Sequence, residues 1–413
     1  MVSVKNTDTT SKEKAADQTC AQGKAALFSS YALLGFFMLL AIDVGFRLAD
    51  QTFHLTDPFE SPNRSLIWWT VNGFEKEKRA PDIALLGSSL MMTAHHAGDA
   101  TKLKEVQNEV THFHSSCLED FLADKTGQKL TSFSFAIAGQ MASDSYFITR
   151  SILAGDKRPK VIVYGIAPRD LIDNTLPSPA STETFKYLSR ISDLCDLALP
   201  TRTSFNEQFA FGLERFFYSL SHRPNLIALQ HRLAYSLAPY GHNAITKNEI
   251  NTFFKLRQLA LFEQPDDNGA NELKVGPYGA EREPFRDNSD EYRHRYARIK
   301  EKTYKCQLAY LENLMKLTNE KGIQLIVVNM PLTAGNVSLM PAGFYDKYKE
   351  TIAGMAQANG VTFLDLNKPG SFERKQFADT VHLNGLGGVA FFKLLSNELA
   401  RDHSFSAALS TTH

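Results

Sequence analysis

The sequence predicts an α/β protein built around a doubly wound, parallel sheet. Short continuous apolar runs, typical of strands covered on both faces, recur along the chain. Helical patterns separate these runs, and two of them end at a glycine that leads directly into the next strand. The 413 residues are 43% hydrophobic, with 29 Phe, 14 Tyr and 2 Trp, so a large folded core is expected rather than disorder.

The N-terminal region contains a candidate membrane anchor. The 18 residues from Ala25 to Ile42 carry no charge, and as a helix they would reach about 27 Å, close to the thickness of a hydrocarbon core. Lysines precede this segment and few basic residues follow it, which favours a cytoplasmic N-terminus. We therefore predict a cytoplasmic tail at residues 1–24, a transmembrane helix at 25–47 and an extracytoplasmic remainder, periplasmic or at the cell surface.

Two alternatives for this segment are a cleaved signal peptide and a buried core helix. The apolar stretch is long for a signal peptide, and residues 43–47 do not form a small-x-small cleavage site. Asp43 and the Ser29-Ser30 pair weaken the membrane span. However, the apolar residues surround the helix instead of forming one stripe, which favours an anchor over a core helix.

Five segments are predicted to form the sheet. They are residues 82–87, 130–136, 160–166, 323–330 and 361–366. Helices are predicted at about 289–321 and 342–359, each followed by a glycine and then a strand. The two halves of the α/β domain are therefore assigned to residues 48–174 and 289–403, and residues 404–413 to a flexible tail.

Residues 175–288 interrupt this alternation and are predicted to form a mainly helical insertion. They lack a good buried strand and contain amphipathic patterns at 205–221 and 225–237. The insertion ends in a polar stretch, residues 264–288, that is predicted to be an exposed loop. It could act as a lid or substrate platform, or it could be a packing elaboration, and the residues do not decide between the two.

Charge and cysteine content exclude several classes of protein. Lys+Arg and Asp+Glu each total 45, so the chain lacks the positive field of a nucleic-acid binder. Four scattered cysteines do not make a disulfide framework. His112, His114 and Cys117 form an HxHxxC cluster that could bind zinc, but a fourth ligand is not obvious and the segment resembles the polar end of a helix. We therefore predict neither a metal nor a cofactor.

Candidate catalytic residues follow the predicted strands, where ligands collect in parallel α/β sheets. Gly87-Ser88-Ser89 follows the first strand, Gly139 follows the second, and Asp379 and His382 follow the fifth. Each fragment alone is as often an ordinary cap or turn. Together they supply what acyl transfer requires: a hydroxyl nucleophile, a base, a carboxylate that orients the base, and donors for an oxyanion. The GxSxG elbow of α/β-hydrolases is absent from the sequence.

These blocks resemble those of the SGNH, or GDSL-like, hydrolase superfamily. Gly87-Ser88-Ser89 is similar to its first block, with Ser89 at the nucleophile position. Gly139 is similar to the second block, whose glycine N–H joins the N–H of the nucleophile in the oxyanion hole. Asp379 and His382 are similar to the last block, which implies that His382 is the general base and that Asp379 orients it.

The resemblance covers about residues 82–170 and 323–400 and implies a flavodoxin-like, five-stranded parallel sheet with helices on both faces. One block departs from the pattern. The third block normally reads Gly-x-Asn-Asp, with Asn donating to the oxyanion, whereas this chain has Ala167 at the Asn position. Arg169 could replace the missing donor, or it could be a salt-bridged loop anchor. Without a replacement, transition-state stabilisation would fall by about 2.7–4 kcal/mol.

The Gly-Ser-Ser variant and the N-terminal anchor together resemble an envelope-associated subset of the superfamily. This subset includes the D-alanylation protein of teichoic acid synthesis and the acetylation proteins of alginate and related exopolysaccharides. The resemblance implies a membrane-anchored acyltransferase or esterase acting on acyl esters, with acetyl as the expected group, of envelope or exported polysaccharide. A membrane-bound O-acyltransferase is the implied partner. The alternative is a catalytically impaired protein that binds glycan or docks such a partner.

Three further polar residues lie near the candidate site. His95 and His96 are six and seven residues beyond Ser89 on the same predicted helix, so we expect them at the surface. Asp144, downstream of Gly139, either supports the oxyanion loop or caps a helix.

Overall fold

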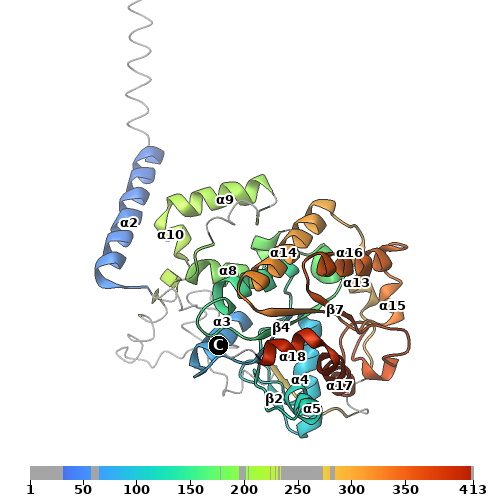
Figure 1. Ribbon diagram of the computed structural model, residues 1–413. Coiled ribbons are helices and arrows are strands. Elements are labelled where there is room, and N and C mark those ends of the chain that lie inside the picture. The colour runs from blue at the N-terminus through green and yellow to red at the C-terminus, as the bar shows by residue number, and fades with distance from the viewer. Residues whose placement is uncertain are drawn as a thin grey trace, which may run out of the picture. The chain divides into compact units, whose positions relative to one another are not determined.

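The computed structural model divides into two compact units. Residues 1–60 with 209–237 form the first unit, and residues 61–208 with 238–413 form the second. The described residues are 31–56, 65–176, 178–194, 201–202, 204–223, 225–227, 229–230, 233, 273–279 and 284–410. The second unit contains the sheet (Figure 1).

The sheet has five parallel strands flanked by helices, which confirms the predicted fold class. Its strands are β1 (Ile83–Gly87), β3 (Ser132–Ser134), β4 (Val161–Ile166), β6 (Gln324–Asn329) and β7 (Thr362–Asp365). Their order in space is β3-β1-β4-β6-β7, so the second strand in the chain lies at one edge beside the first, which is the flavodoxin-like arrangement. β1 and β4 are buried throughout, as their continuous apolar runs predict. The edge strand β3 is shorter than the predicted segment 130–136.

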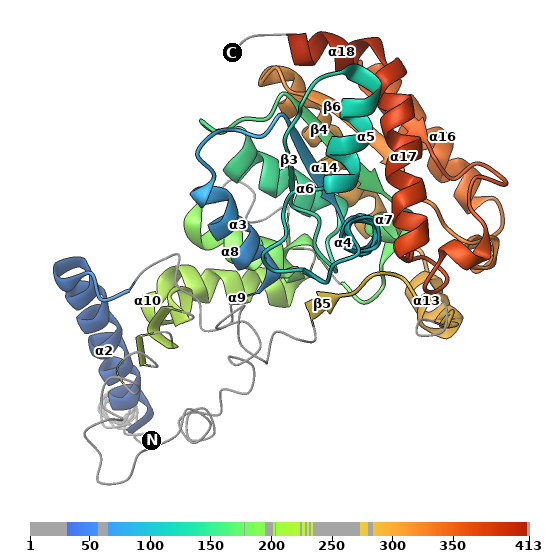
Figure 2. The same ribbon diagram turned by 90° about the horizontal axis from the view of Figure 1, so that it is seen from below.

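Two layers of helices cover the sheet (Figure 2). The helices α4 (Ser89–Leu103), α5 (Ser116–Thr126) and α17 (Gly385–Arg401) pack together as one layer. In the other, α14 (Glu301–Glu320) packs on α6 (Ala142–Ile148) and, through Tyr304 and Phe344, on α16 (Phe344–Ala358). Right-handed crossovers between parallel strands place successive helices in this way.

Glycines bring α4 and α17 into backbone contact. A Cβ on Gly388 would lie 2.4 Å from the carbonyl oxygen of Ala94 and 2.8 Å from the Cα of Gly98. A Cβ on Gly385 would lie 2.9 Å from the carbonyl oxygen of Ala97. Because α4 begins at Ser89, this close packing fixes the start of α17, and the loop before it, against the helix that carries the candidate nucleophile.

The helix predicted at residues 289–321 is two helices, and that prediction was wrong. α13 (Ser289–Tyr296) ends before α14 begins at Glu301. The carbonyl oxygen of Arg295 accepts hydrogen bonds from the backbone N–H and the side-chain amide of Asn174, at 3.3 and 2.9 Å. This tertiary contact occupies a carbonyl oxygen that would accept a backbone hydrogen bond in a continuous helix. No helix-breaking residue in the sequence predicts the interruption.

The remaining elements of the second unit are short or peripheral. They are α3 (Leu66–Lys76), a π-helix (Thr149–Leu153), α7 (Arg169–Ile172), two 3₁₀ helices (Pro179–Ser181 and Arg374–Gln376), α8 (Glu183–Ile191), α15 (Ala334–Val337), α18 (His403–Ser410), and the antiparallel pair β2 (Gln107–Asn108) and β5 (Lys274–Val275). The tail assigned to residues 404–413 is helical up to residue 410, because Phe405 is fully buried and anchors α18.

The first unit contains a helix long and apolar enough to cross a membrane by length and composition. This helix, α2 (Tyr31–Phe53), extends beyond the predicted end at residue 47, and residues 25–30 lie outside the described part of the chain. Part of the insertion belongs to this unit: the carboxylate of Asp43 accepts hydrogen bonds from the backbone N–H groups of Tyr218 and Ser219, at 2.8 and 2.7 Å. These two residues begin α10 (Tyr218–Ser221), which follows α9 (Phe205–Phe216).

Candidate active site

The candidate nucleophile lies at a sharp turn between β1 and α4. Gly87 ends the strand with a φ of +148°, and a Cβ there would lie 2.8 Å from the carbonyl oxygen of Gly165 on β4. Glycine is therefore required at this turn. Ser88 is the N-cap of α4 and Ser89 is its first residue. The free N–H groups at the start of the helix favour negative charge near the Ser89 hydroxyl.

Ser89, His382 and Asp379 form one chain of hydrogen bonds. Ser89 Oγ lies 2.8 Å from His382 Nε2, across 293 residues of sequence. His382 Nδ1 lies 2.7 Å from Asp379 Oδ2. Both distances are typical of hydrogen bonds between a nucleophile, its base and the group that orients the base. The structure thus brings these three selected residues together, and their catalytic role stays a prediction.

Hydrogen bonds hold the carboxylate of Asp379 in one orientation. Its Oδ1 accepts from the backbone N–H groups of Val381 and His382, at 2.9 and 2.8 Å, so that Oδ2 is left for the imidazole. Burial by itself would raise the pKa of Asp379, but the hydrogen bonds and the charge interaction with His382 outweigh it, and the pKa lies below its usual value. A charged carboxylate at Nδ1 favours the tautomer whose Nε2 lone pair faces Ser89.

The loop that carries His382 is fixed at both ends. Asn384 caps α17 by accepting from the N–H of Gly387 at 3.1 Å, and its amide donates to the carbonyl oxygen of Lys375 at 2.8 Å. Thr333, which caps α15, donates its hydroxyl to the carbonyl oxygen of Thr380 at 2.7 Å. The base is therefore presented by a loop whose backbone polar groups are satisfied on both sides.

The loop of Gly139 lies at the same edge of the sheet as Ser89. The N–H of Ile137 donates to the carbonyl oxygen of Gly87 at 3.1 Å, two residues before Ser89. Gly139 itself has a φ of +85°, is exposed, and has open space where a Cβ would be. Its position is compatible with the predicted oxyanion donor, and that role remains a prediction.

Asp144 supports this loop by capping the helix that follows it. Asp144 Oδ2 accepts from the N–H of Met141 at 2.7 Å, and Oδ1 accepts from the hydroxyl of Thr182 at 2.6 Å. Burial raises the pKa of Asp144 to about 7. Both expectations for this residue therefore describe one arrangement, in which the cap anchors the end of the Gly139 loop.

Arg169 contacts the Gly139 loop from the interior of the protein. Its buried guanidinium donates from Nε to Asp173 Oδ2 at 2.8 Å and from Nη1 to the carbonyl oxygen of Gln140 at 2.5 Å. These bonds support the loop-anchor interpretation of Arg169. A direct role in the oxyanion hole stays a prediction.

Ala167 occupies the position where the resembling family has an oxyanion donor. It is buried at the end of β4, and its N–H donates to Asp170 Oδ2 at 3.0 Å. Its methyl side chain offers no donor. Burial raises the pKa of Asp170 to about 6, against the opposing effect of the neighbouring Arg169.

Two residues beside the candidate triad were missed by the sequence analysis, which treated residues 264–288 as an exposed loop. The Arg286 guanidinium lies 3.9 Å from Asp379 Oδ2, and the Arg286 side chain is 73% exposed. Asn288 Oδ1 accepts from the N–H of Thr380 at 3.1 Å. No local motif marks either residue, because only folding brings the end of the insertion to the His382 loop.

The expectation that His95 and His96 lie at the surface was wrong. Both are buried, at 0% and 3% exposure. They lie on the face of α4 that is covered by the segment leading into α5: His95 Nε2 is 3.2 Å from the carbonyl oxygen of His114, and His96 Nε2 is 3.1 Å from that of His112. Burial, with smaller effects from His95 and His112, lowers the pKa of His96 well below its usual value.

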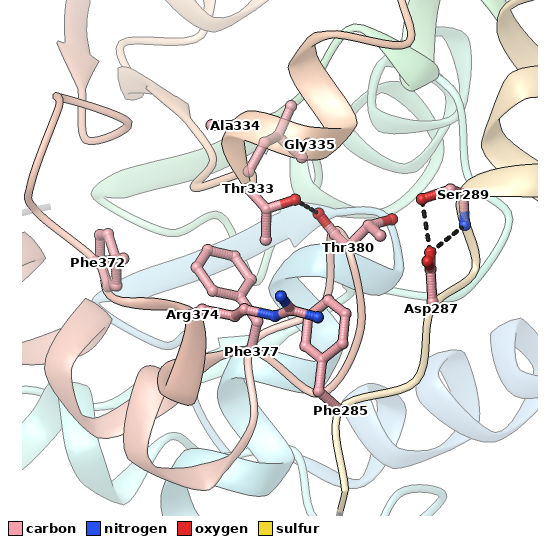
Figure 3. A pocket seen from close by; sticks show the side chains of 11 residues that line it. Phe285, Asp287, Ser289, Thr333, Ala334, Gly335, Phe372, Arg374, Phe377 and Thr380 are labelled. Atoms are coloured by element: carbon pink, nitrogen blue, oxygen red, sulfur yellow. Dashed lines mark hydrogen bonds between the residues drawn. The ribbon is translucent and has the colours of Figure 1, made fainter.

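A cavity of about 430 Å³ borders the loop that carries Asp379 and His382 (Figure 3). Thr380, which follows Asp379, forms part of its wall. The guanidinium of Arg374 stacks on the ring of Phe285, with Cζ 4.3 Å from the ring centroid. The remaining lining residues are Asp287, Ser289, Leu332, Thr333, Ala334, Gly335, Phe372 and Phe377. Aromatic rings beside hydroxyls and a guanidinium are suited to a polar ring-shaped ligand.

Comparisons with known proteins identify no family. No family model matches the chain, and no curated protein matches it. Among solved structures, the chain is similar to a Bacteroides fragilis NCTC 9343 protein described as a "putative acylhydrolase", with 11% sequence identity and a TM-score of 0.32. The similarity covers 81% of this chain and 96% of that one. A likeness of this size does not assign a function to this chain.

Proposed function

We propose that this protein is a membrane-anchored, extracytoplasmic serine acyltransferase or esterase with an SGNH-like catalytic domain. Its substrates would be acyl esters, with acetyl as the expected group, of cell-envelope or exported polysaccharide. The observation that carries the proposal is the continuous hydrogen-bonded chain from Ser89 Oγ through His382 to Asp379. Such a chain at the carboxyl edge of a parallel sheet is the arrangement that nucleophilic acyl transfer requires.

The chemistry proceeds in two steps. His382 Nε2 takes the hydroxyl proton of Ser89 as Oγ attacks the ester carbonyl, and the imidazolium is stabilised by Asp379. The tetrahedral intermediate collapses, the ester C–O bond breaks, and the leaving alkoxide takes the proton from His382. The acyl-serine then reacts with a second hydroxyl, from a glycan or from water, by the same steps in reverse order. Transfer and hydrolysis therefore differ only in the acceptor.

The N–H groups of Ser89 and Gly139 are the proposed oxyanion donors. Ser89 contributes from the start of α4, and Gly139 from a loop that Arg169 and Asp144 hold in place. Because Ala167 offers no side-chain donor, the hole is expected to have one donor fewer than in the resembling family. We expect slower acylation than a complete site would give.

The surroundings of the triad support the proposed substrate class. The cavity beside Thr380 has aromatic rings, hydroxyls and the Arg374 guanidinium, which suit a sugar ring. The candidate membrane helix α2 would hold the enzyme at the envelope, where a membrane-bound O-acyltransferase could supply or receive the acyl group. Replacing Phe285 or Arg374 by alanine should then raise KM for a glycan ester and leave hydrolysis of p-nitrophenyl acetate unchanged.

A fluorophosphonate probe tests the proposal on the detergent-purified full chain. The wild-type protein should be labelled, and Ser89→Ala should not. Ser88→Ala is the matched control. Ser88 occupies the N-cap position of α4, but its hydroxyl makes no hydrogen bond to the helix and should be dispensable for labelling. Labelling that survives in Ser89→Ala, or that is lost equally in both variants, would count against Ser89 as the nucleophile.

The second candidate is a catalytically impaired protein that uses the cavity beside Thr380 to bind glycan or that docks the O-acyltransferase. The methyl group of Ala167 and the engagement of Arg169 by protein groups favour it. Under this alternative, the folded wild-type protein resists the probe even at high concentration while still binding polysaccharide. Absence of labelling together with retained glycan binding would therefore replace the enzymatic proposal with this one.

A further inference from the structure

We infer that His95, Asp99 and His112 form a binding site for a single divalent transition-metal ion such as Zn²⁺, separate from the candidate triad. One ligand atom from each residue lies within 4.8 Å of the other two. This set differs from the HxHxxC cluster of the sequence, because His112 pairs with Asp99 on α4, whereas His114 pairs with Glu77. The site is unrelated to the acyl chemistry proposed above.

The carboxylate of Asp99 lies close to both imidazoles. Asp99 Oδ2 lies 2.8 Å from His112 Nε2 and 3.5 Å from His95 Nε2. Ligand atoms about 2.1 Å from a tetrahedral zinc ion are about 3.4 Å apart. An ion would therefore keep the spacing of Asp99 and His95 and widen the spacing of Asp99 and His112 by about 0.6 Å, a shift that the partly exposed His112 side chain can make.

Local structure preorganises the set. His95 and Asp99 are four residues apart on α4, so they project from the same face of one helix, as paired ligands do in many helical metal sites. The second element is the segment that carries His112, and it is tied to the same carboxylate. Asp99 accepts from the N–H groups of Ser116 and Cys117, both at 2.8 Å, which fixes its orientation. Such outer hydrogen bonds are what orient a metal-binding carboxylate.

The polar contacts of His95 are long for a fully buried imidazole. Its Nδ1 has no hydrogen-bond partner among the described residues, and its Nε2 is 3.2 Å from the carbonyl oxygen of His114 and 3.5 Å from Asp99. A metal bond at Nε2 would replace these long contacts, with the His95 ring proton on Nδ1. Binding would also exchange the hydrogen bond between His112 Nε2 and Asp99 for two metal bonds, with the His112 ring proton moving to Nδ1.

The charge and access of the site suit a cation. Asp99 supplies one negative charge, and both histidines pair with its carboxylate. The His112 side chain is 18% exposed, so an ion and the water that completes its coordination can enter there. An ion held here would join α4, which begins at Ser89, to the segment that leads into α5, and its role would be structural.

Metal content and thermal unfolding of the detergent-purified full chain test this inference. After chelator treatment and dialysis against Zn²⁺, the wild-type protein should retain one zinc per chain by mass spectrometry and melt at a higher temperature than without zinc. The double variant His95→Ala, His112→Ala should retain none and show no rise. His114→Ala is the matched control, because this histidine is in the same segment but pairs with Glu77. It should behave like the wild type.

Equal zinc retention by the wild type and the double variant would overturn the inference, as would loss of zinc from His114→Ala alone. The double variant could fail to fold, as judged by circular dichroism and size exclusion. In that case the visible absorption spectrum of the wild type loaded with Co²⁺ tests the inference. Visible bands typical of a four-coordinate nitrogen and oxygen site support the inference, and the weak spectrum of octahedral Co²⁺ contradicts it.

Discussion

Replacing Asp379 by asparagine tests the proposed role of the triad with little change in shape. In the wild type, Oδ1 accepts two backbone N–H groups and Oδ2 accepts the imidazole. The new amide nitrogen must face one side or the other. Facing the backbone it opposes two donors, whereas facing the imidazole it opposes one, and each buried mismatch costs about 1–3 kcal/mol. The amide nitrogen should therefore face His382 Nδ1.

This orientation disables the base without displacing it. To accept from the amide, Nδ1 of His382 must lose its proton, which moves to Nε2 and points at Ser89 Oγ. The imidazole can then no longer take the serine proton. The equivalent exchange in serine proteases with this geometry lowers the rate about 10⁴-fold, which corresponds to about 5.4 kcal/mol of transition-state stabilisation. We expect a loss of this order in the rate of fluorophosphonate labelling.

The assay is the second-order rate of labelling, with Ser89→Ala as the zero baseline. Thermal unfolding serves as the control for folding, because the two backbone hydrogen bonds to Oδ1 persist in the asparagine variant. The melting temperature should therefore change little. A labelling rate within tenfold of the wild type, in a folded Asp379→Asn protein, would refute the proposed orientation of His382 by Asp379.

Three further predictions follow from other contacts. Arg286→Ala should change the labelling rate less than about fivefold, because a guanidinium exposed to solvent and 3.9 Å from its partner contributes about 0.2–1 kcal/mol, and a loss of a hundredfold would reveal a direct role. Gly388→Ala should destabilise the protein by about 1–3 kcal/mol in denaturant unfolding, since the new Cβ meets the backbone of α4, and an unchanged midpoint would contradict this packing. Because the pKa of Asp170 is raised to about 6, the native state keeps a proton that the unfolded chain releases near pH 4, so this group stabilises at low pH and loses its contribution as pH rises to about 6. Asp170→Asn should remove up to about 1.4 kcal/mol per pH unit from the slope of unfolding free energy in that window, and identical slopes would show that Asp170 ionises normally.

The sequence pattern correctly predicted those strands, turns and helix starts that depend on residues close together in the chain. The strands β1, β4, β6 and β7 lie within two residues of the predicted segments. For the central strands β1, β4 and β6 the reason is that a continuous apolar run has few alternatives to a buried strand. The turn at Gly87 and the start of α4 at Ser89 were also predictable, since a glycine after a strand and a serine N-cap are local signals.

Expectations failed where a distant contact decided the outcome. The predicted helix at 289–321 breaks because Asn174 takes the carbonyl oxygen of Arg295. His95 and His96 are buried because the segment around residues 112–114 covers their face of α4. Helical spacing alone shows which residues share a face but not which segment will cover it.

The sequence by itself determined the class of sheet, the apolar helix near the N-terminus, and the set of hydroxyl, imidazole and carboxylate residues that could carry acyl chemistry. Only the tertiary structure decided that Ser89 Oγ and His382 Nε2 lie 2.8 Å apart, and that Arg286 and Asn288 reach the same loop. The physical reason is that strands, turns and caps are set by residues a few positions apart. The meeting of residues 293 positions apart depends instead on how α17 packs on α4 through Gly98 and Gly388, and this packing has no local signature.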